Sequence, residues 1–200
     1  MKKAPLIVIE GIDGAGKTTI AKWLVDWFNS KGYRAIYTYE PTDSQLVDAL
    51  KRSSYRSAVL DALVYAADRI LHLYNKILPA LENGVVVVMD RYYYSSVAYQ
   101  GAQGADIEWV FTINRYALKP DLAIYIDVDP ETGLSRLKSL GSRRFPEYEE
   151  VSLLKRVREI YLMLVERGEL ILVDGRRSID EVKNSVLEIV LSRLSSFFRL

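Results

Sequence analysis

The chain has 200 residues, which is enough for about one domain with a substantial buried core. Half of the residues are hydrophobic, and 27 Lys and Arg oppose 26 Asp and Glu. This composition excludes a wholly disordered chain and gives no basic excess for nucleic-acid binding. The sequence has no cysteine and one histidine, which excludes a disulfide scaffold and thiol catalysis and argues against a His-rich metal site.

The N-terminal segment has only a short apolar run, at residues 6–9, before Glu10 interrupts it. Such a run is too short for the core of a secretory signal. No other stretch approaches the ~20 apolar residues that a membrane span needs. We therefore expect a soluble cytoplasmic protein that does not engage a membrane.

Short apolar runs alternate with helix-like segments along the chain. The runs cover residues 6–9, 34–39, 85–89, 122–126 and 170–173. Runs that are apolar on both faces are typical of buried parallel strands, and their alternation with helices indicates an α/β fold. Ligands bind at the carboxyl ends of strands in such sheets, so the segments that follow the strands should carry the chemistry.

A phosphate-binding motif directly follows the first run. It reads Gly11-Ile12-Asp13-Gly14-Ala15-Gly16-Lys17-Thr18 and continues with Thr19. The pattern is G-x-x-x-x-G-K-T between a strand and a helix, where backbone N–H groups can surround phosphate oxygens. In such loops the lysine reaches the β and γ phosphates and the hydroxyl binds Mg²⁺, which assigns these roles to Lys17 and Thr18. The alternative is a glycine-rich turn that binds nothing.

Asp90 directly follows the third run, beside the predicted phosphate loop. A carboxylate at this place can support Mg²⁺, directly or through water. The alternative is a structural role, either as a helix cap or as a partner for Arg91.

The phosphate loop predicts nucleotide binding more firmly than it predicts a reaction. One hypothesis is a phosphotransferase that acts on a small molecule, and another is a nucleotide-dependent switch or binding module. A GTP switch usually carries an N-K-x-D motif that reads guanine. The segment Asn114-Arg115-Tyr116-Ala117 comes nearest to it and lacks the Asp.

A second candidate site lies on a helix predicted over residues 57–78. Tyr65, Arg69 and His72 fall on one side of this helix. The opposite side is apolar and holds Leu60, Leu63, Ala67, Ile70, Tyr74 and Leu78. An aromatic ring beside a guanidinium can stack on a base and bond its carbonyl edge, which suits Tyr65 and Arg69. The alternative is a solvated polar face.

Arg91 follows the predicted Mg²⁺ carboxylate and is placed to grip an acceptor phosphate. Four tyrosines come within the next eight residues, at positions 92, 93, 94 and 99. The alternative for this segment is a tyrosine-rich helix start that packs on the sheet.

Together these stretches resemble the thymidylate kinase family over nearly the whole chain. The resemblance rests on residues 9–19, Glu40-Pro41, Ala67-Asp68-Arg69, Asp90-Arg91-Tyr92, Ser95, Ala98-Tyr99-Gln100, Lys119-Pro120-Asp121-Leu122 and Asp127-Val128-Asp129-Pro130. It implies a P-loop nucleotide-kinase fold with a five-stranded parallel sheet, and one nucleoside-monophosphate-kinase domain over residues 1–200 that forms a homodimer.

The resemblance also implies a reaction, the transfer of the γ-phosphate of ATP to dTMP with Mg²⁺ in the synthesis of dTTP. The acceptor roles that it implies are Asp13 at the sugar 3′-hydroxyl, Tyr65 and Arg69 at thymine, Arg91 at the phosphate, Tyr99 at the deoxyribose and Gln100 near the base. Another nucleotide or nucleoside kinase of the same fold, with a different acceptor, is the alternative.

A short lid is expected at residues 140–149. Some members of the family carry a charge-neutralising arginine inside the phosphate loop, and others carry it in the lid. The variable loop positions here hold no arginine, which assigns the role to Arg143 and Arg144, with Arg136 as a lesser candidate. The alternative is a solvated basic turn.

Overall fold

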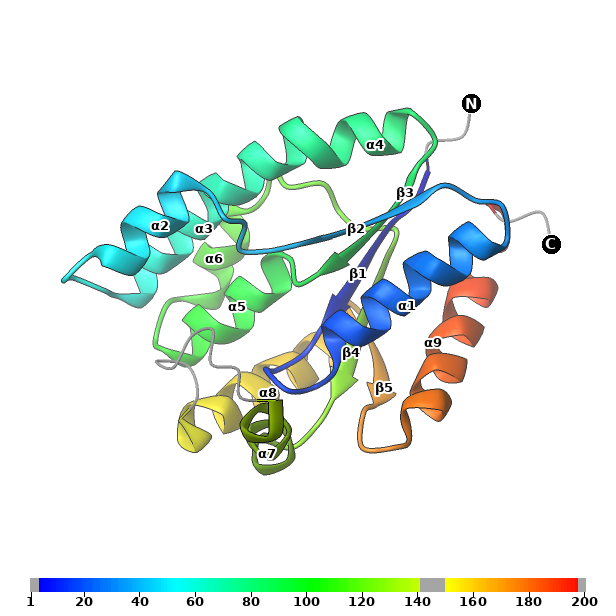
Figure 1. Cartoon of the computed structure of the whole chain (residues 1–200). Helices are drawn as coiled ribbons and strands as arrows, with labels where there is room; N and C mark the ends of the chain where they lie inside the picture. The colour runs from blue at the N-terminus through cyan, green and yellow to red at the C-terminus, as the bar shows by residue number, and fades with distance from the viewer. Residues whose placement is uncertain (1–3, 141–149, 198–200) are drawn as a thin grey trace.

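A five-stranded parallel sheet forms the centre of the protein (Figure 1). The computed structural model describes residues 4–140 and 150–197. The strands are β1 (Leu6–Glu10), β2 (Ala35–Tyr39), β3 (Val86–Asp90), β4 (Leu122–Asp127) and β5 (Ile171–Asp174), in the order β2-β3-β1-β4-β5. The predicted strands and their parallel arrangement are confirmed. Every residue of β1, β3 and β4 is buried, which explains why these runs are apolar on both faces.

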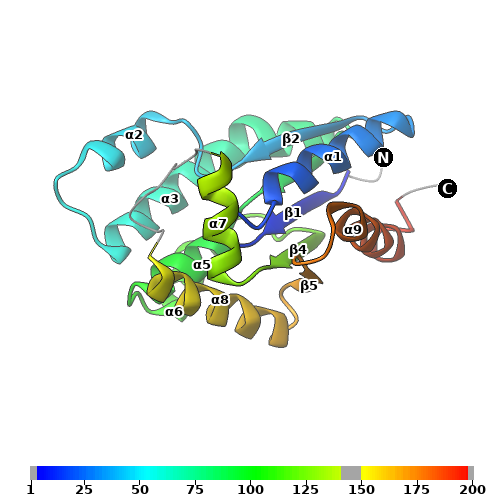
Figure 2. The same cartoon turned by 60° about the horizontal axis from the view of Figure 1, so that its bottom comes forward.

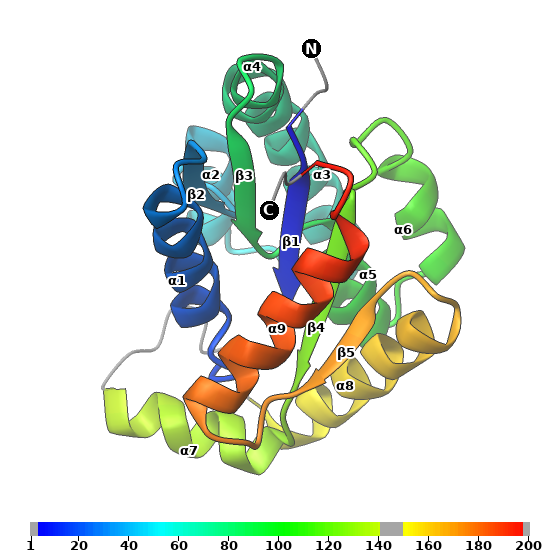
Figure 3. The ribbon, with the colours of Figure 1, turned by 90° about the vertical axis from the view of Figure 1, so that its right-hand side faces the viewer.

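Helices cover both faces of the sheet, as predicted (Figure 3). One face carries α1 (Lys17–Ser30) and α9 (Ile179–Arg193), and the other carries α3 (Ala58–His72), α5 (Tyr93–Ala102) and α8 (Val151–Glu166). A π turn (Leu73–Ile77) joins α3 to α4 (Leu78–Glu82). The shorter helices are α2 (Gln45–Arg52) and α6 (Ile107–Ile113). Within the described ranges, the helices are too short or too polar to cross a membrane.

The helix α7 (Pro130–Leu140) lies at the carboxyl ends of the strands, against the phosphate loop (Figure 2). Two glycines permit this approach. A Cβ atom on Gly14 would stand 2.0 Å from the carbonyl oxygen of Gly133, and a Cβ atom on Gly133 would stand 2.7 Å from that of Asp13. The backbones therefore meet directly, and α7 fixes the position of the loop.

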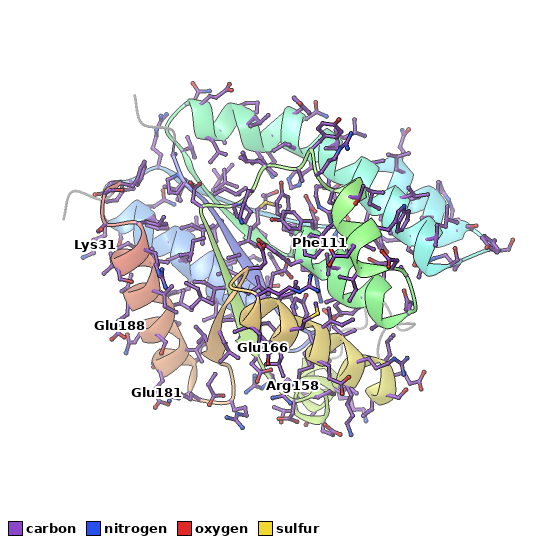
Figure 4. The ribbon with its side chains drawn as sticks, turned by 180° about the vertical axis from the view of Figure 1, so that it is seen from behind. Lys31, Phe111, Arg158, Glu166, Glu181 and Glu188 are labelled. Atoms are coloured by element: carbon purple, nitrogen blue, oxygen red, sulfur yellow. The ribbon has the colours of Figure 1, made fainter. Side chains whose placement is uncertain are left out.

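An ion pair ties α8 to the same end of the sheet. Arg158, labelled on α8 in Figure 4, donates from Nε and Nη2 to the two carboxylate oxygens of Asp127, both at 2.8 Å. Because Asp127 ends β4, this bidentate pair anchors the helix close to the edge where ligands are expected.

The predicted helix over residues 57–78 exists, but its polar side faces inward. Tyr65 is 9% exposed and Arg69 is 2% exposed, whereas Leu63 is 47% and Tyr74 is 64% exposed. The alternative of a solvated polar face is therefore wrong. The physical reason is that Arg69 finds hydrogen-bond partners in Glu40, directly after β2, and in Asn114, at the end of α6, so its burial is compensated.

Candidate active site

The phosphate loop lines a large open cavity at the carboxyl end of β1. Residues 13–19 of the loop contribute to its wall, together with Asp90, Arg91 and Arg136. Gly14 and Gly16 have φ values of 80° and 92°, a left-handed conformation that glycine adopts without strain. The predicted loop residues Gly11 and Ile12 are buried and lie behind this wall rather than in it.

Lys17 is buried at the floor of this donor cavity. Its Nζ donates to the carbonyl oxygen of Ile12 at 2.8 Å and lies 3.7 Å from Asp13 Oδ1. Burial and the neighbouring charge of Arg91 lower the pKa of the Lys17 ammonium, and the carboxylates of Asp13 and Asp90 oppose this shift. A cation held in this way is positioned to interact with an anionic ligand.

Thr18 and Asp90 lie in direct contact at the edge of the donor cavity. Thr18 Oγ1 donates to Asp90 Oδ2, and the Tyr37 hydroxyl donates to the same oxygen at 3.4 Å. The other oxygen, Asp90 Oδ1, is buried without a hydrogen-bond partner. An unpaired buried carboxylate oxygen is costly, and a carboxylate beside a hydroxyl is a ligand set that suits Mg²⁺.

A second, smaller cavity adjoins the first. Its lining includes all of the predicted acceptor residues, which are Asp13, Tyr65, Arg69, Arg91, Tyr99 and Gln100. Asp13, Glu40, Pro41 and Arg91 line both cavities. The residues expected to face the donor and the acceptor therefore meet at one boundary.

Arg91 stands at this boundary. Its Nη2 donates to Asp13 Oδ1 at 2.7 Å and to the Tyr99 hydroxyl at 3.2 Å, and its Nη1 donates to Ser95 Oγ at 2.9 Å. The guanidinium carbon lies 4.9 Å from the centre of the Tyr99 ring. Arg91 makes its ion pair with Asp13 rather than with Asp90, so the structural alternative that pairs Asp90 with Arg91 is wrong.

Arg69 also lines the acceptor cavity and is held by three side chains. Its Nε donates to Glu40 Oε2 at 2.7 Å, its Nη1 donates to Asn114 Oδ1 and its Nη2 donates to Ser96 Oγ at 3.2 Å. His72 Nδ1 lies 3.2 Å from the other oxygen of Glu40. No role was predicted for Glu40 or Asn114, although Glu40 directly follows β2, where site residues are expected in a parallel sheet.

Gln100 presents an unpaired acceptor in the acceptor cavity. Its Oε1 is buried and has no hydrogen-bond partner. Among the described side chains, the only other buried polar atoms without a partner are Asp90 Oδ1 and the Tyr92 hydroxyl. Because an unpaired buried carbonyl oxygen is costly, this position favours a ligand that brings an N–H donor.

The expected lid arginines, Arg143 and Arg144, lie outside the described residues. The lesser candidate, Arg136, lies on α7 and lines the donor cavity, where its Nη2 donates to the carbonyl oxygen of Gly175 at 3.1 Å.

Comparison with known proteins agrees with this geometry. Residues 9–186 match a family model described as thymidylate kinase. A protein of Staphylothermus marinus named probable thymidylate kinase is 57% identical over 190 residues, covering 94% of this chain and 95% of that protein. Proteins of the same name from Pyrococcus horikoshii and Thermococcus gammatolerans are 42% and 41% identical, and the matches cover 96% and 97% of their lengths.

The chain belongs to the thymidylate kinase family. Membership confirms the predicted resemblance, and the P-loop fold agrees with it. Thymidylate kinases are phosphotransferases with ATP as co-substrate, so the chain is an enzyme of this class rather than a nucleotide switch. The roles of its individual side chains stay predictions.

Proposed function

We propose that this chain transfers the γ-phosphate of ATP to dTMP, giving ADP and dTDP for the synthesis of dTTP. It acts in the cytoplasm as one nucleoside-monophosphate-kinase domain over residues 1–200. The observation that carries the proposal is the pair of adjoining cavities. One is lined by the phosphate loop and the other by all six predicted acceptor residues, and Asp13 and Arg91 belong to both.

The reaction requires alignment and charge neutralisation more than covalent chemistry from the protein. The loop amides and Lys17 hold the phosphates of ATP in the donor cavity. Arg91, at the boundary, holds the phosphate of dTMP and brings its oxygen toward the γ-phosphate. An ionised phosphate oxygen is already a nucleophile, so no general base is assigned.

Thr18 and Asp90 fit the Mg²⁺ ion that this reaction uses. Thr18 Oγ1 supplies a hydroxyl ligand, and Asp90, whose Oδ1 is buried and unpaired, supports the ion directly or through water. When bound, the ion neutralises charge on the phosphate oxygens. A single carboxylate is sufficient because Mg²⁺ at phosphate-transfer sites takes further ligands from phosphates and water.

The acceptor cavity suits thymine through its ring face and its polar edge. Tyr65 supplies an aromatic face, Arg69 supplies N–H donors and Gln100 Oε1 supplies a buried acceptor. Thymine presents a carbonyl oxygen and an N3–H that complement this set. Cytosine presents an amino group and an unprotonated ring nitrogen, which would leave buried groups unpaired at about 1–3 kcal/mol each.

A coupled assay of ADP release tests this proposal. With ATP and Mg²⁺, we expect turnover that depends on dTMP and is absent with thymidine, which lacks the acceptor phosphate. ADP release that proceeds equally well with CMP or AMP would move the assignment to another kinase of the same fold.

We further propose that the protein forms a homodimer through the outer side of α3. An apolar stripe on this helix continues onto the π turn that follows it and faces solvent. It contains Val59, Leu63, Ala67 and Leu71 on α3 and Tyr74 on the turn. A second copy would cover the stripe and support the helix that carries Tyr65 and Arg69 on its inner side. Light scattering should give twice the mass of the chain for the wild type and the monomer mass for Leu63→Asp. Leu172→Ser, on exposed Leu172 of β5, is the control that should stay dimeric.

A further inference from the structure

Arg91 has an unusual backbone conformation for a residue that must be placed accurately. Its φ is 70°, and no other non-glycine residue in the described parts of the chain has a positive φ. The left-handed region is unfavourable for a residue with a Cβ atom, so neighbouring bonds have to maintain it. The backbone N–H groups on either side of the Arg91 Cα, those of Arg91 and Tyr92, both donate hydrogen bonds to the end of β1. That of Arg91 donates to the Ile9 carbonyl oxygen at 3.0 Å, and that of Tyr92 donates to Glu10 Oε1 at 2.7 Å.

Glu10 also caps the helix that follows Arg91. The N-cap residue of α5, Tyr92, makes no side-chain cap. Instead, the N–H of Ser95 in the first turn donates to Glu10 Oε1 at 3.2 Å. The Glu10 carboxylate therefore caps α5 in place of a side chain from the N-cap residue. It lies at the positive end of the helix, where a negative charge is favourable. The alternative in which Asp90 caps a helix is wrong for α5, because Asp90 accepts from the Thr18 and Tyr37 hydroxyls and from no N–H group of this helix.

The second oxygen of Glu10 connects to the Arg91 side chain through Ser95. Ser95 Oγ donates to Glu10 Oε2 at 2.6 Å and accepts from Arg91 Nη1 at 2.9 Å. Since an ionised carboxylate only accepts, the serine hydrogen has to point to Glu10, which leaves the serine lone pairs for the guanidinium. The Tyr161 hydroxyl donates to the same carboxylate oxygen at 2.9 Å.

Glu10 is fully buried and lines neither cavity. Burial raises the pKa of its carboxyl group, and the bonds from Ser95 and the charge of Arg91 oppose this shift. The donors around Glu10 are therefore arranged for a charged carboxylate in a place where an unpaired charge would be very unfavourable.

We propose that Glu10 is a positioning residue for the acceptor phosphate. It fixes the turn at Arg91 through the Tyr92 amide, and it fixes the Arg91 guanidinium through the Ser95 hydroxyl. The inference rests on the proposed function and adds to it a buried residue that acts through Arg91 without touching either nucleotide.

The test compares the binding of dTMP with the binding of thymidine, which has the same base and sugar without the phosphate. Glu10→Gln keeps an acceptor for the amides but places an NH₂ group against Ser95. The serine hydroxyl then accepts from this NH₂ group, and its hydrogen turns away from residue 10 toward the guanidinium. We expect calorimetry to show dTMP binding about tenfold weaker and thymidine binding within about twofold of wild type.

Further variants test the hydrogen bonds that connect Glu10 to Arg91. Tyr161→Phe removes one donor to Glu10 and a hydroxyl 3.0 Å from Ser95 Oγ. It leaves the Tyr92 and Ser95 links between Glu10 and Arg91 in place, so both affinities should stay near wild type. Ser95→Ala cuts the link to the guanidinium and leaves the Tyr92 bond, and it should weaken dTMP selectively even if Glu10→Gln does not fold. In an Arg91→Ala background, Glu10→Gln should add no further loss of dTMP affinity.

Equal weakening of dTMP and thymidine in folded Glu10→Gln or Ser95→Ala would overturn the inference, because it would indicate a general structural role. So would an undiminished affinity for dTMP in both variants. If wild-type protein neither binds nor phosphorylates dTMP, the proposed function itself fails, and this outcome is separate from any effect of Glu10.

Discussion

Arg91 Nη2 donates to Asp13 Oδ1 at 2.7 Å and thereby joins the turn after β3 to the phosphate loop after β1. β1 and β3 are neighbours in the sheet, so their carboxyl ends bring the two residues together. Asp13 belongs to the loop expected to hold ATP, and Arg91 belongs to the segment expected to hold dTMP. The ion pair therefore marks the boundary across which the phosphoryl group is to be transferred.

Lys17→Ala should abolish turnover and leave the protein folded. Lys17 is buried, but its Nζ bonds a carbonyl oxygen of its own loop, so its loss should cost no more than about 1–2 kcal/mol of stability. Thermal unfolding measured beside the ADP-coupled assay checks this. Near-normal activity in a folded variant would show that the loop is not the donor site.

Gln100→Ala should weaken the preference for dTMP over CMP. The substitution removes the buried acceptor that thymine N3–H can satisfy and the hydrogen-free N3 of cytosine cannot, so we expect discrimination in kcat/KM to fall by roughly 1–3 kcal/mol. Ser139→Ala, an exposed change on α7, is the control that should retain full discrimination. If the ratio of kcat/KM for dTMP to kcat/KM for CMP is unchanged in Gln100→Ala, other residues discriminate between the bases.

Tyr99 should exclude nucleotides with a 2′-hydroxyl through its ring. Tyr99→Phe keeps the ring and should keep the preference for the deoxy sugar, although losing the bond from Arg91 Nη2 should raise the KM for dTMP modestly. Tyr99→Ala should lose the preference. Relative kcat/KM values for dTMP and its ribose counterpart measure both effects. A folded Tyr99→Ala that still rejects the ribonucleotide would refute this role.

Arg143 and Arg144 should supply charge to the transition state. An arginine in this role contributes ~10³–10⁵ in rate in related phosphoryl transfers. The double alanine variant should therefore lose kcat while dTMP binding stays near wild type. Arg136→Ala makes a useful comparison, because Arg136 lines the donor cavity. If only Arg136→Ala lowers kcat at saturating substrates, Arg136 on α7 supplies the charge to the transition state and Arg143 and Arg144 do not.

Gly133→Ala should displace the phosphate loop. The added Cβ would stand 2.7 Å from the carbonyl oxygen of Asp13 and 3.1 Å from Ile12 Cδ1, so backbone has to move. We expect a loss of about 1–3 kcal/mol in stability and a raised KM for ATP, because the loop amides lose their alignment. An alanine variant with wild-type melting temperature and KM would show that α7 does not hold the loop in place.

The sheet and the phosphate loop were predictable because their signals are local. Strands such as β1 and β3 are buried on both faces and so read as continuous apolar runs. The loop motif lies between β1 and α1 within one short segment. In both cases the conformation of a residue is determined mainly by residues that lie close to it in the sequence.

The support of the acceptor site was not predictable in the same way. Arg69 is buried because Glu40 and Asn114, which lie 29 and 45 residues away in the sequence, pair with it. Helical periodicity alone could not decide between this and a solvated face. Likewise, Glu10 holds Arg91 across 81 residues of sequence only because β1 and β3 are adjacent. The alternative for the tyrosine-rich segment is confirmed, because Tyr92, Tyr93 and Tyr94 are all buried in the hydrophobic core.

A competition between nucleotides shows which monophosphate the enzyme phosphorylates. The enzyme is mixed with limiting ATP, Mg²⁺ and equal concentrations of dTMP, UMP, CMP and AMP, and the diphosphate products are separated by chromatography. The cavity lined by Tyr65, Arg69 and Gln100 predicts that dTDP is the dominant diphosphate formed from the four acceptor nucleotides. UDP, CDP or the ADP formed from labelled AMP in amounts equal to or above dTDP would contradict the account.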